Sequence, residues 1–222
     1  MVCSGETTKL LIMAPKDLRF KKVDPNIEFN VNVCDKVVNE STDEKLLGLV
    51  ISSNMTWRTH LYGNNKSGDE KIVGLVTQLS KRVGILTKLS KLMSPSQFSR
   101  ICEGIFTSKV TYCLQVFGNV WGIPTMDETD RRFSAFSKED NRRLQVLQNK
   151  VLRLKTGLGK ETSTANLIKK SGDLSIQQLI AFHTIMTVFK TLNNKKPQYI
   201  YENFKIRNSK LMESFHNGKV TK

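Results

Sequence analysis

The stretch from Ser94 to Gly122 constrains this 222-residue chain most, because its apolar residues cover most of a helical circumference. Ser94 and Gln97 flank Pro95 in the order of a capping box with proline at the first helical position. Two adjoining apolar sides follow, namely Phe98, Cys102, Ile105, Tyr112 and Val116, and Phe106, Val110, Cys113 and Phe117. Such a helix must be surrounded, so we expect it at the centre of the fold, with another backbone close to Gly104.

The first 52 residues contain four short segments with strand patterns. Residues 27–33 alternate apolar and polar side chains, which predicts a half-buried strand, and Lys36–Asn39 follows as the second arm of a hairpin. Lys9–Ala14 is a short apolar run that ends at a proline. Lys45–Ser52 is almost continuously apolar, which is typical of an interior strand. Together these segments predict a small antiparallel sheet.

Helical patterns dominate the remaining sequence. A short helix is predicted from Trp57 to Gly63, and a long amphipathic helix over residues 71–93. Ser137 and Asp140 have the order of a capping box for a helix that should end at Gly157. Two further helices are predicted, over residues 164–171 and from Ser175 through Leu192.

These patterns predict an α+β fold class. We expect a small N-terminal antiparallel sheet within residues 1–55 and a mostly α-helical bundle over residues 56–205. Residues 206–222 are polar and basic, and we expect a flexible tail there.

Positive charge is unevenly distributed along the chain. The net charge is +15, yet residues 1–70 have a balance of −1 and residues 71–222 a balance of +16. This asymmetry predicts a polyanionic partner, with nucleic acid favoured over an anionic membrane. The alternative is a charged surface that serves solubility. No apolar run has the length of a membrane span and the first residues lack a signal-peptide pattern, so we expect no membrane partner and an intracellular protein, nuclear or cytoplasmic.

Basic residues gather on the non-core faces of two predicted helices, where they could follow a phosphate backbone. The candidate nucleic-acid-binding residues on them are Lys81, Arg82, Lys88 and Lys91 in the first helix, and Arg142, Arg143, Lys150 and Arg153 in the second. For any single residue of this set, an ordinary solvated helix face is the simpler interpretation.

No pattern for catalysis or metal binding is present. The sequence lacks a phosphate-binding P-loop, a nucleophile elbow and a zinc-protease motif, and its four cysteines form no C-x-x-C pair. Asp127, Glu128 and Asp130 are close together, but a solvated acidic turn explains them better than a metal site. We therefore predict no catalytic residue, no metal ligand and no cofactor in this chain.

Four segments in a fixed order resemble the reverse transcriptases of non-LTR (LINE-type, jockey-like) retrotransposons. KLLGLVIS followed by NMTWRTHL is similar to their "YLGV-I…LTW–H" segment, and SKVTYCLQVFGNVWG to their "K-L-Y-C…WG" segment. LQVLQNKVLRL is similar to their "LQ–QN-A-R" helix, and PQYI to their closing "P-YL". The resemblance spans residues 45–200.

The resemblance implies a place in the polymerase hand. Residues 1–52 would be the end of the palm, with Lys45 and Gly48 in the primer-grip region, and residues 56–200 would be a thumb that holds an RNA/DNA template–primer duplex. The family's Asp-Asp motif and its Mg²⁺ would belong to an upstream fingers and palm segment, which would also be a partner of this chain.

We therefore expect a truncated, nucleic-acid-binding fragment of an RNA-directed DNA polymerase that is inactive alone. The alternative is a stand-alone helical protein-interaction module derived from such an element.

Overall fold

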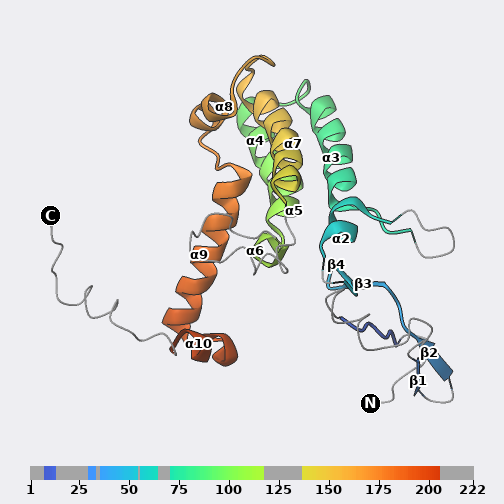
Figure 1. Cartoon of the computed structure of the whole chain (residues 1–222). Helices are drawn as coiled ribbons and strands as arrows, with labels where there is room; N and C mark the ends of the chain where they lie inside the picture. Colours follow the sequence, from blue (N-terminus) through green and yellow to red (C-terminus); the bar gives the residue numbers. More distant parts are fainter. Residues whose placement is uncertain are drawn as a thin grey trace, which may run out of the picture. The chain divides into compact units, whose positions relative to one another are not determined.

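A computed structural model describes residues 8–13, 30–33, 36–54, 56–64, 71–117 and 137–205. The fold is α+β, as predicted, with two small antiparallel sheets and a larger set of helices (Figure 1). The chain divides into two compact units, residues 1–180 and 181–222, which are described separately below. The boundaries predicted after residues 55 and 205 stay predictions.

In the described part of the chain, four strands come first and the helices follow. The strands are β1 (Asn30–Val33), β2 (Lys36–Asn39), β3 (Asp43–Leu46) and β4 (Leu49–Ser52). The helices of the first unit are α2 (Arg58–Tyr62), α3 (Leu75–Leu89), α4 (Pro95–Cys102), the π-helical turn η1 (Glu103–Thr107), α5 (Ser108–Thr111), α6 (Leu114–Phe117), α7 (Lys138–Thr156) and α8 (Thr164–Ser171). The helix α9 (Ile176–Asn194) begins in the first unit and continues into the second, which also contains α10 (Gln198–Lys205).

The two sheets are separate hairpins. β1 pairs with β2 in antiparallel register, with Val31 opposite Val38, which confirms the predicted hairpin. Residues 27–29 of the predicted strand lie outside the described residues. The predicted strand over Lys9–Ala14 is wrong in its described part, because Leu10 makes only an isolated bridge to Glu40.

The interpretation of Lys45–Ser52 as one strand is also wrong. This segment contains the turn of a second hairpin, in which Leu46 of β3 pairs with Leu49 of β4. The two turn residues, Leu47 and Gly48, have φ angles of 49° and 84°, and positive φ at both positions characterises a two-residue type I′ turn. Leucine is an unusual residue there, since the left-handed region is costly for a side chain with a Cβ.

Helix α2 ends where glycine allows two chain segments to meet. Gly63 has a φ of 83°, and its N–H donates to the carbonyl of Thr59. A Cβ atom on Gly63 would lie 2.2 Å from the carbonyl oxygen of Ile72, and one on Gly74 would lie 2.2 Å from the carbonyl carbon of Tyr62. This contact turns the chain from α2 into α3 and confirms the predicted helix end.

The capping motifs predicted at Ser137 and Ser175 are confirmed. The Ser137 hydroxyl accepts from the backbone N–H of Asp140, whose side chain accepts in return, and Gly157 closes α7 with a φ of 68°. Ser175 and Gln178 make the reciprocal pair of hydrogen bonds before α9, at 2.9 and 3.2 Å. The capping box predicted at Ser94 is wrong, because the Ser94 hydroxyl donates to the Gln97 side chain at 2.8 Å and makes no hydrogen bond to the helix backbone. Helix α8 covers the predicted residues 164–171.

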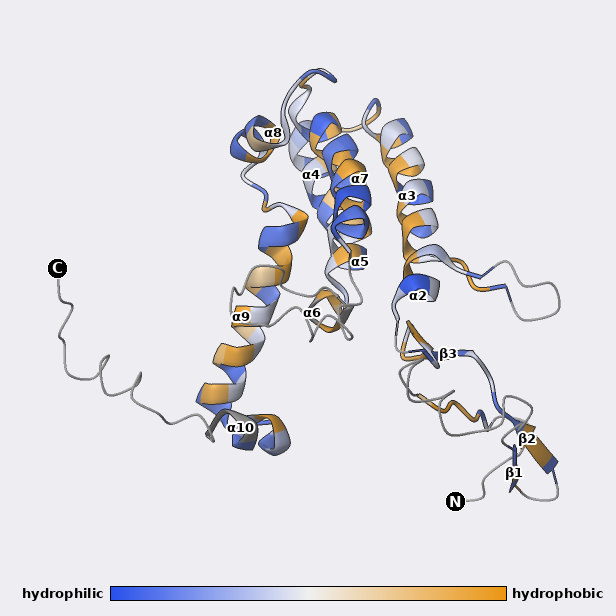
Figure 2. Ribbon diagram, in the orientation of Figure 1, coloured by the Kyte–Doolittle hydropathy of each residue, from blue (hydrophilic) through white to orange (hydrophobic). Residues whose placement is uncertain are grey.

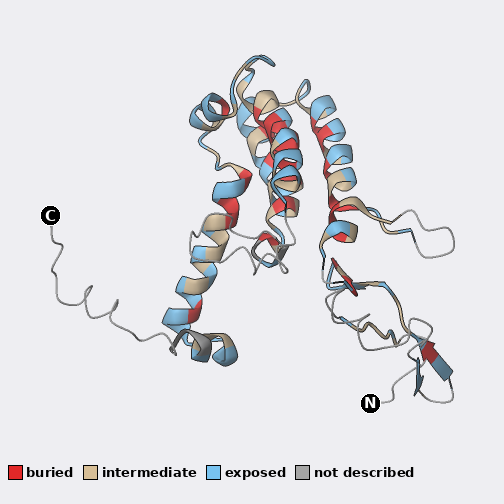
Figure 3. Cartoon of the chain, in the orientation of Figure 1, coloured by how far each residue is buried: buried red, intermediate tan, exposed pale blue. Residues whose placement is uncertain are grey.

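The main core lies where α3, α4, η1, α5 and α7 meet, and Figure 3 shows buried residues along these helices. Helices α3 and α7 pack against each other, and apolar and polar residues lie on different sides of α3 (Figure 2). The residues of α3 and α7 in this core are Leu75, Leu79, Val83, Leu86, Leu144, Leu147 and Val151.

The central helix differs from its prediction. It is continuous from Pro95 to Thr111, but the chain leaves helical geometry at Cys113, whose φ is 54°. Tyr112 and Val116 are therefore 47% and 53% exposed, not buried. Residues 118–122 of the predicted helix lie outside the described residues. The expected close approach at Gly104 is wrong too, because the space around that glycine is open.

A single line of side chains from this segment enters the core. The buried residues are spaced by four, and they are Phe98, Cys102, Phe106, Val110 and Leu114. In a regular α-helix a spacing of four drifts around the axis by about 40° per step. The wider turn of η1 opposes that drift, so the line keeps facing the same neighbours.

Candidate nucleic-acid interface

Helix α3 presents positive charge without compensation on the same helix. It contains Lys81, Arg82 and Lys88 and no acidic residue. Lys81 and Lys88 are exposed, as is Lys91 in the turn that follows, and none of these three has an ion pair with a described residue. Arg82 is half-buried, and its Nη1 donates to the carbonyl of Ile105. The three lysines are thus available to a partner in solution.

The two arginines at the start of α7 share one carboxylate. Arg142 donates to both oxygens of Glu139, at 2.7 and 2.9 Å, and Arg143 donates to one of them at 3.1 Å. These hydrogen bonds hold the pKa of Glu139 at about 2, so the carboxylate is ionised at neutral pH. Glu139 therefore offsets half of the positive charge that the sequence predicted at this end of the helix.

A tyrosine joins α2 to the same end of α7. The Tyr62 hydroxyl donates to Oδ1 of Asp140, and the Arg143 guanidinium lies 5.1 Å from the centre of the Tyr62 ring. Burial and the hydrogen bond to Asp140 raise the pKa of Tyr62 to about 12. Arg143 thus has contacts on two elements, which fix its position more firmly than that of Arg142.

Farther along α7, Lys150 and Arg153 differ in their surroundings. Lys150 is exposed and has no ion pair within the described part of the chain. Arg153 is half-buried, and its guanidinium donates to the carbonyls of Gly159, Lys160 and Thr162 at 3.2–3.3 Å. The expectation that Arg153 projects into solvent is wrong, because the loop between α7 and α8 folds over it.

This difference predicts unequal effects of two arginine substitutions on stability. Arg153→Ala should lower the free energy of unfolding by about 1–2 kcal/mol, since three loop carbonyls lose a charged donor. Arg142→Ala removes a solvent-exposed ion pair and should leave the unfolding midpoint almost unchanged. Urea unfolding of both variants tests this, and equal midpoints would contradict it.

Polar residues of the LQVLQNK segment make interhelical hydrogen bonds. Gln148 and Asn149 are buried, and their amide groups donate to the carbonyl of Leu174 at 2.7 Å and to the Thr164 hydroxyl at 2.8 Å. Gln145 accepts from the backbone N–H of Ile176 at 3.0 Å. These side chains join α7 to α8 and to the start of α9, which is a structural role.

A second group of cations forms where β3, α3 and α5 approach one another. Lys45 and Arg82 both lower the pKa of Lys109 on α5, after the larger effect of burial. Lys109 contributes in turn to lowering the pKa of His60 to about 4, again after burial. Lys109 was not among the predicted site residues, although it is the lysine of the segment that is similar to "K-L-Y-C…WG", and it lies next to the core residue Val110.

The hairpin turn beside this group is held by the end of the central helix. The Tyr112 hydroxyl donates to the carbonyl of Leu47 at 2.5 Å. A Cβ atom on Gly48 would make only an ordinary contact with the Tyr112 ring, at 3.4 Å, so glycine suits this position by its positive φ. Lys45 is exposed on β3, two residues before the turn.

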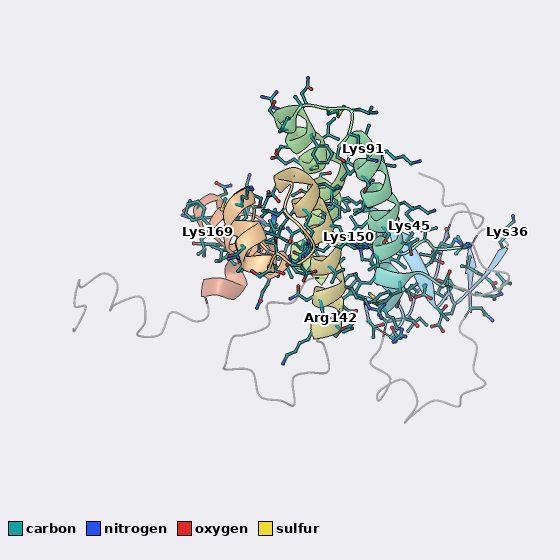
Figure 4. All side chains as sticks on the ribbon, turned by 90° about the horizontal axis from the view of Figure 1, so that it is seen from above. Lys36, Lys45, Lys91, Arg142, Lys150 and Lys169 are labelled. Atoms are coloured by element: carbon teal, nitrogen blue, oxygen red, sulfur yellow. The ribbon has the colours of Figure 1, made fainter. Side chains whose placement is uncertain are left out.

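The predicted binding residues thus fall into separate groups. Lys45 and Arg82 each affect the pKa of Lys109, while Arg142 and Arg143 lie at the start of α7. Figure 4 shows Lys91, Arg142, Lys169 and Lys36 at different sides of the first unit. An extended, multi-contact surface fits this distribution better than one compact patch.

Within the described ranges, no group of three or more histidine, cysteine or acidic residues could hold a metal ion, and no helix combines the length and apolar character of a membrane span. Comparisons with protein-family models, with curated proteins and with solved structures give no match to this chain.

Proposed function

We propose that this chain binds double-stranded nucleic acid through its phosphate backbone, as a fragment similar to the thumb of a non-LTR retrotransposon reverse transcriptase. The observation that carries the proposal is the acid-free helix α3, whose exposed lysines have no ion pair with a described residue. Lys150 on α7, which packs against α3, adds a fourth cation of the same kind. Contacts to phosphate fix position without reading bases, so sequence preference should be weak.

The chain should not polymerise nucleotides by itself. Neither the sequence nor the described structure contains a cluster of carboxylates of the kind that two-metal polymerases use. Template-dependent incorporation of nucleotides by the purified chain would refute the fragment interpretation.

A salt titration tests the binding proposal. If Lys81, Lys88, Lys91 and Lys150 each neutralise one phosphate, the logarithm of affinity should fall against the logarithm of salt concentration with a slope of about −3 to −4. Fluorescence anisotropy with an RNA–DNA hybrid and a DNA duplex, each in two unrelated sequences, measures the slope. The double variant Lys81→Gln/Lys88→Gln should make it shallower by about 2.

A matched control separates specific contacts from net charge. Lys169 and Lys170 are exposed on α8, so Lys169→Gln/Lys170→Gln removes the same charge from another helix. This control should leave the slope almost unchanged. An equal loss in both double variants would mean that net charge alone drives binding, and absence of duplex binding at low salt would overturn the proposal.

A second candidate function, that of a helical protein-interaction module, is favoured by one feature of the second unit. Phe182, Ile185, Phe189 and Leu192 are spaced by three, four and three residues along α9 and are 41–64% exposed. Such spacing places them on one helical face, the pattern by which helices recognise apolar partner surfaces. Binding through this face would be insensitive to salt, unlike binding to phosphates.

A further inference from the structure

A cavity of about 520 Å³ lies between the β3–β4 hairpin and the helices α2, α3 and α5. Its wall includes four lysines from separate parts of the chain, Lys9, Lys45, Lys71 and Lys109, together with the buried His60. This volume is in the usual range for small-molecule pockets, so it suits a small ligand or one group of a larger one.

Three carboxylates also line this cavity, those of Glu40, Asp43 and Glu44. None of them forms an ion pair with Lys109 within the described part of the chain. Glu44 forms an ion pair with Lys9 at 3.8 Å. Asp43 accepts a hydrogen bond from the Ser52 hydroxyl at 2.5 Å and another from the Thr42 hydroxyl at 3.3 Å. The carboxylates of Asp43 and Glu44 are thus engaged within or beside the hairpin.

Lys109 is the uncompensated group of this cavity. It is half-buried, and it makes no hydrogen bond or ion pair with a residue in the described part of the chain. The charges close enough to affect its pKa are those of Arg82 and Lys45, which are also positive. A partly desolvated ammonium among like charges is costly to the fold, and an anion between them would remove that cost.

Arg82 cannot move away from Lys109 without losing a contact of its own. Its Nη1 donates to the carbonyl of Ile105 in η1, four residues before Lys109. The guanidinium is therefore held beside α5, where it adds to the positive field at that wall. Arrangements that reduce stability in this way are typical of ligand sites.

We propose that this cavity binds a phosphate group, with Lys109 as its central ligand and Lys45 and Lys71 as further ligands from the hairpin and from the segment before α3. The phosphate could belong to a small phosphate ester or to a nucleic-acid strand, since the chemistry of recognition is the same. The site does not depend on duplex binding through α3, because Lys81 and Lys88 do not line the cavity.

The first test uses the whole chain and free phosphate. Inorganic phosphate and a nucleoside monophosphate, added at constant ionic strength, should raise the melting temperature, and calorimetric titration should give a dissociation constant for each. Lys109→Gln should weaken that binding by about tenfold to a hundredfold, because a charge-assisted hydrogen bond is lost. Lys169→Gln, at an exposed position on α8, should leave it unchanged.

The behaviour without ligand provides a second measurement. In phosphate-free buffer Lys109→Gln should melt at the same temperature as the parent or higher, because the substitution removes repulsion between cations. Lys45→Gln, at an exposed position, should also weaken phosphate binding without a loss of stability. An equal phosphate effect on the parent and on both variants would show general salting-out, and would overturn the proposal.

Duplex binding separates the two sources of the phosphate. If Lys109→Gln weakens duplex binding and free phosphate competes with the duplex, the cavity takes a phosphate of the nucleic acid. If the variant loses free phosphate but binds the duplex like the parent, the ligand is a small phosphate ester. Should the chain bind no duplex at all, the free-phosphate measurements still decide the cavity proposal.

Discussion

Replacing Phe106 with alanine should lower the free energy of unfolding by about 3–5 kcal/mol. Phe106 is 2% exposed and belongs to the core cluster, together with Phe98 and Val110 from the same segment. Alanine would leave a cavity, because the helices that pack around Phe106 cannot move far enough to fill it. Urea unfolding of the parent and the variant, followed by circular dichroism, measures the difference.

Two neighbouring substitutions make this result specific. Ile105 is half-buried at the edge of the core, so Ile105→Ala should cost about 1 kcal/mol, and Val116→Ala, at an exposed position, less than about 0.5 kcal/mol. If Phe106→Ala does not fold, Phe106→Leu should fold with a smaller loss of stability. Equal losses at Ile105 and Phe106 would contradict the placement of the buried line.

Local interactions explain why the helix boundaries could be predicted. The capping boxes at Ser137 and Ser175 and the glycines after α7 and α8 satisfy backbone groups within a few residues, so sequence spacing is sufficient to recognise them. The ion pairs of Arg142 and Arg143 with Glu139 could also have been inferred, since spacings of three and four place these residues on one helix face.

The second hairpin could not be predicted in the same way. Its turn is Leu47–Gly48, and leucine is not among the residues that favour positive φ. The Tyr112 hydroxyl, 65 residues away in the sequence, supports that turn through the carbonyl of Leu47. A contact of this kind exists only after the chain has folded, so the continuous apolar run was the stronger signal.

In the candidate site, too, sequence spacing predicts local features but not contacts between distant segments. The sequence predicted a basic surface, which stays a prediction, but spacing could not reveal that Arg153 binds loop carbonyls or that Lys45 and Arg82 affect the pKa of Lys109. These hydrogen bonds and charge effects act between residues that are separated in the sequence. The predicted loop around Asp127, Glu128 and Asp130 lies outside the described residues.

Lowering the pH from 7 to 5 should destabilise the chain by about 2 kcal/mol through His60 alone. His60 is 8% exposed, and its Nδ1 accepts a hydrogen bond from the backbone N–H of Val50 at 3.3 Å. Burial, with a further effect of Lys109, lowers its pKa from 6.5 to about 4. Between these two values the unfolded chain binds a proton that the folded chain does not, so stability falls as the pH falls.

The effect should begin near pH 6.5 and be complete only below pH 4, where both states carry the proton and the total loss reaches about 3 kcal/mol. His60→Asn provides the control, because an amide oxygen can accept from Val50 but does not titrate. This variant should be less stable at pH 7 and much less dependent on pH between 6.5 and 5, a window above the range in which most carboxylates titrate. Urea unfolding at half-unit pH intervals distinguishes the two proteins. Parallel stability curves for the parent and His60→Asn would mean that the fold does not lower the pKa of His60, and would contradict the prediction.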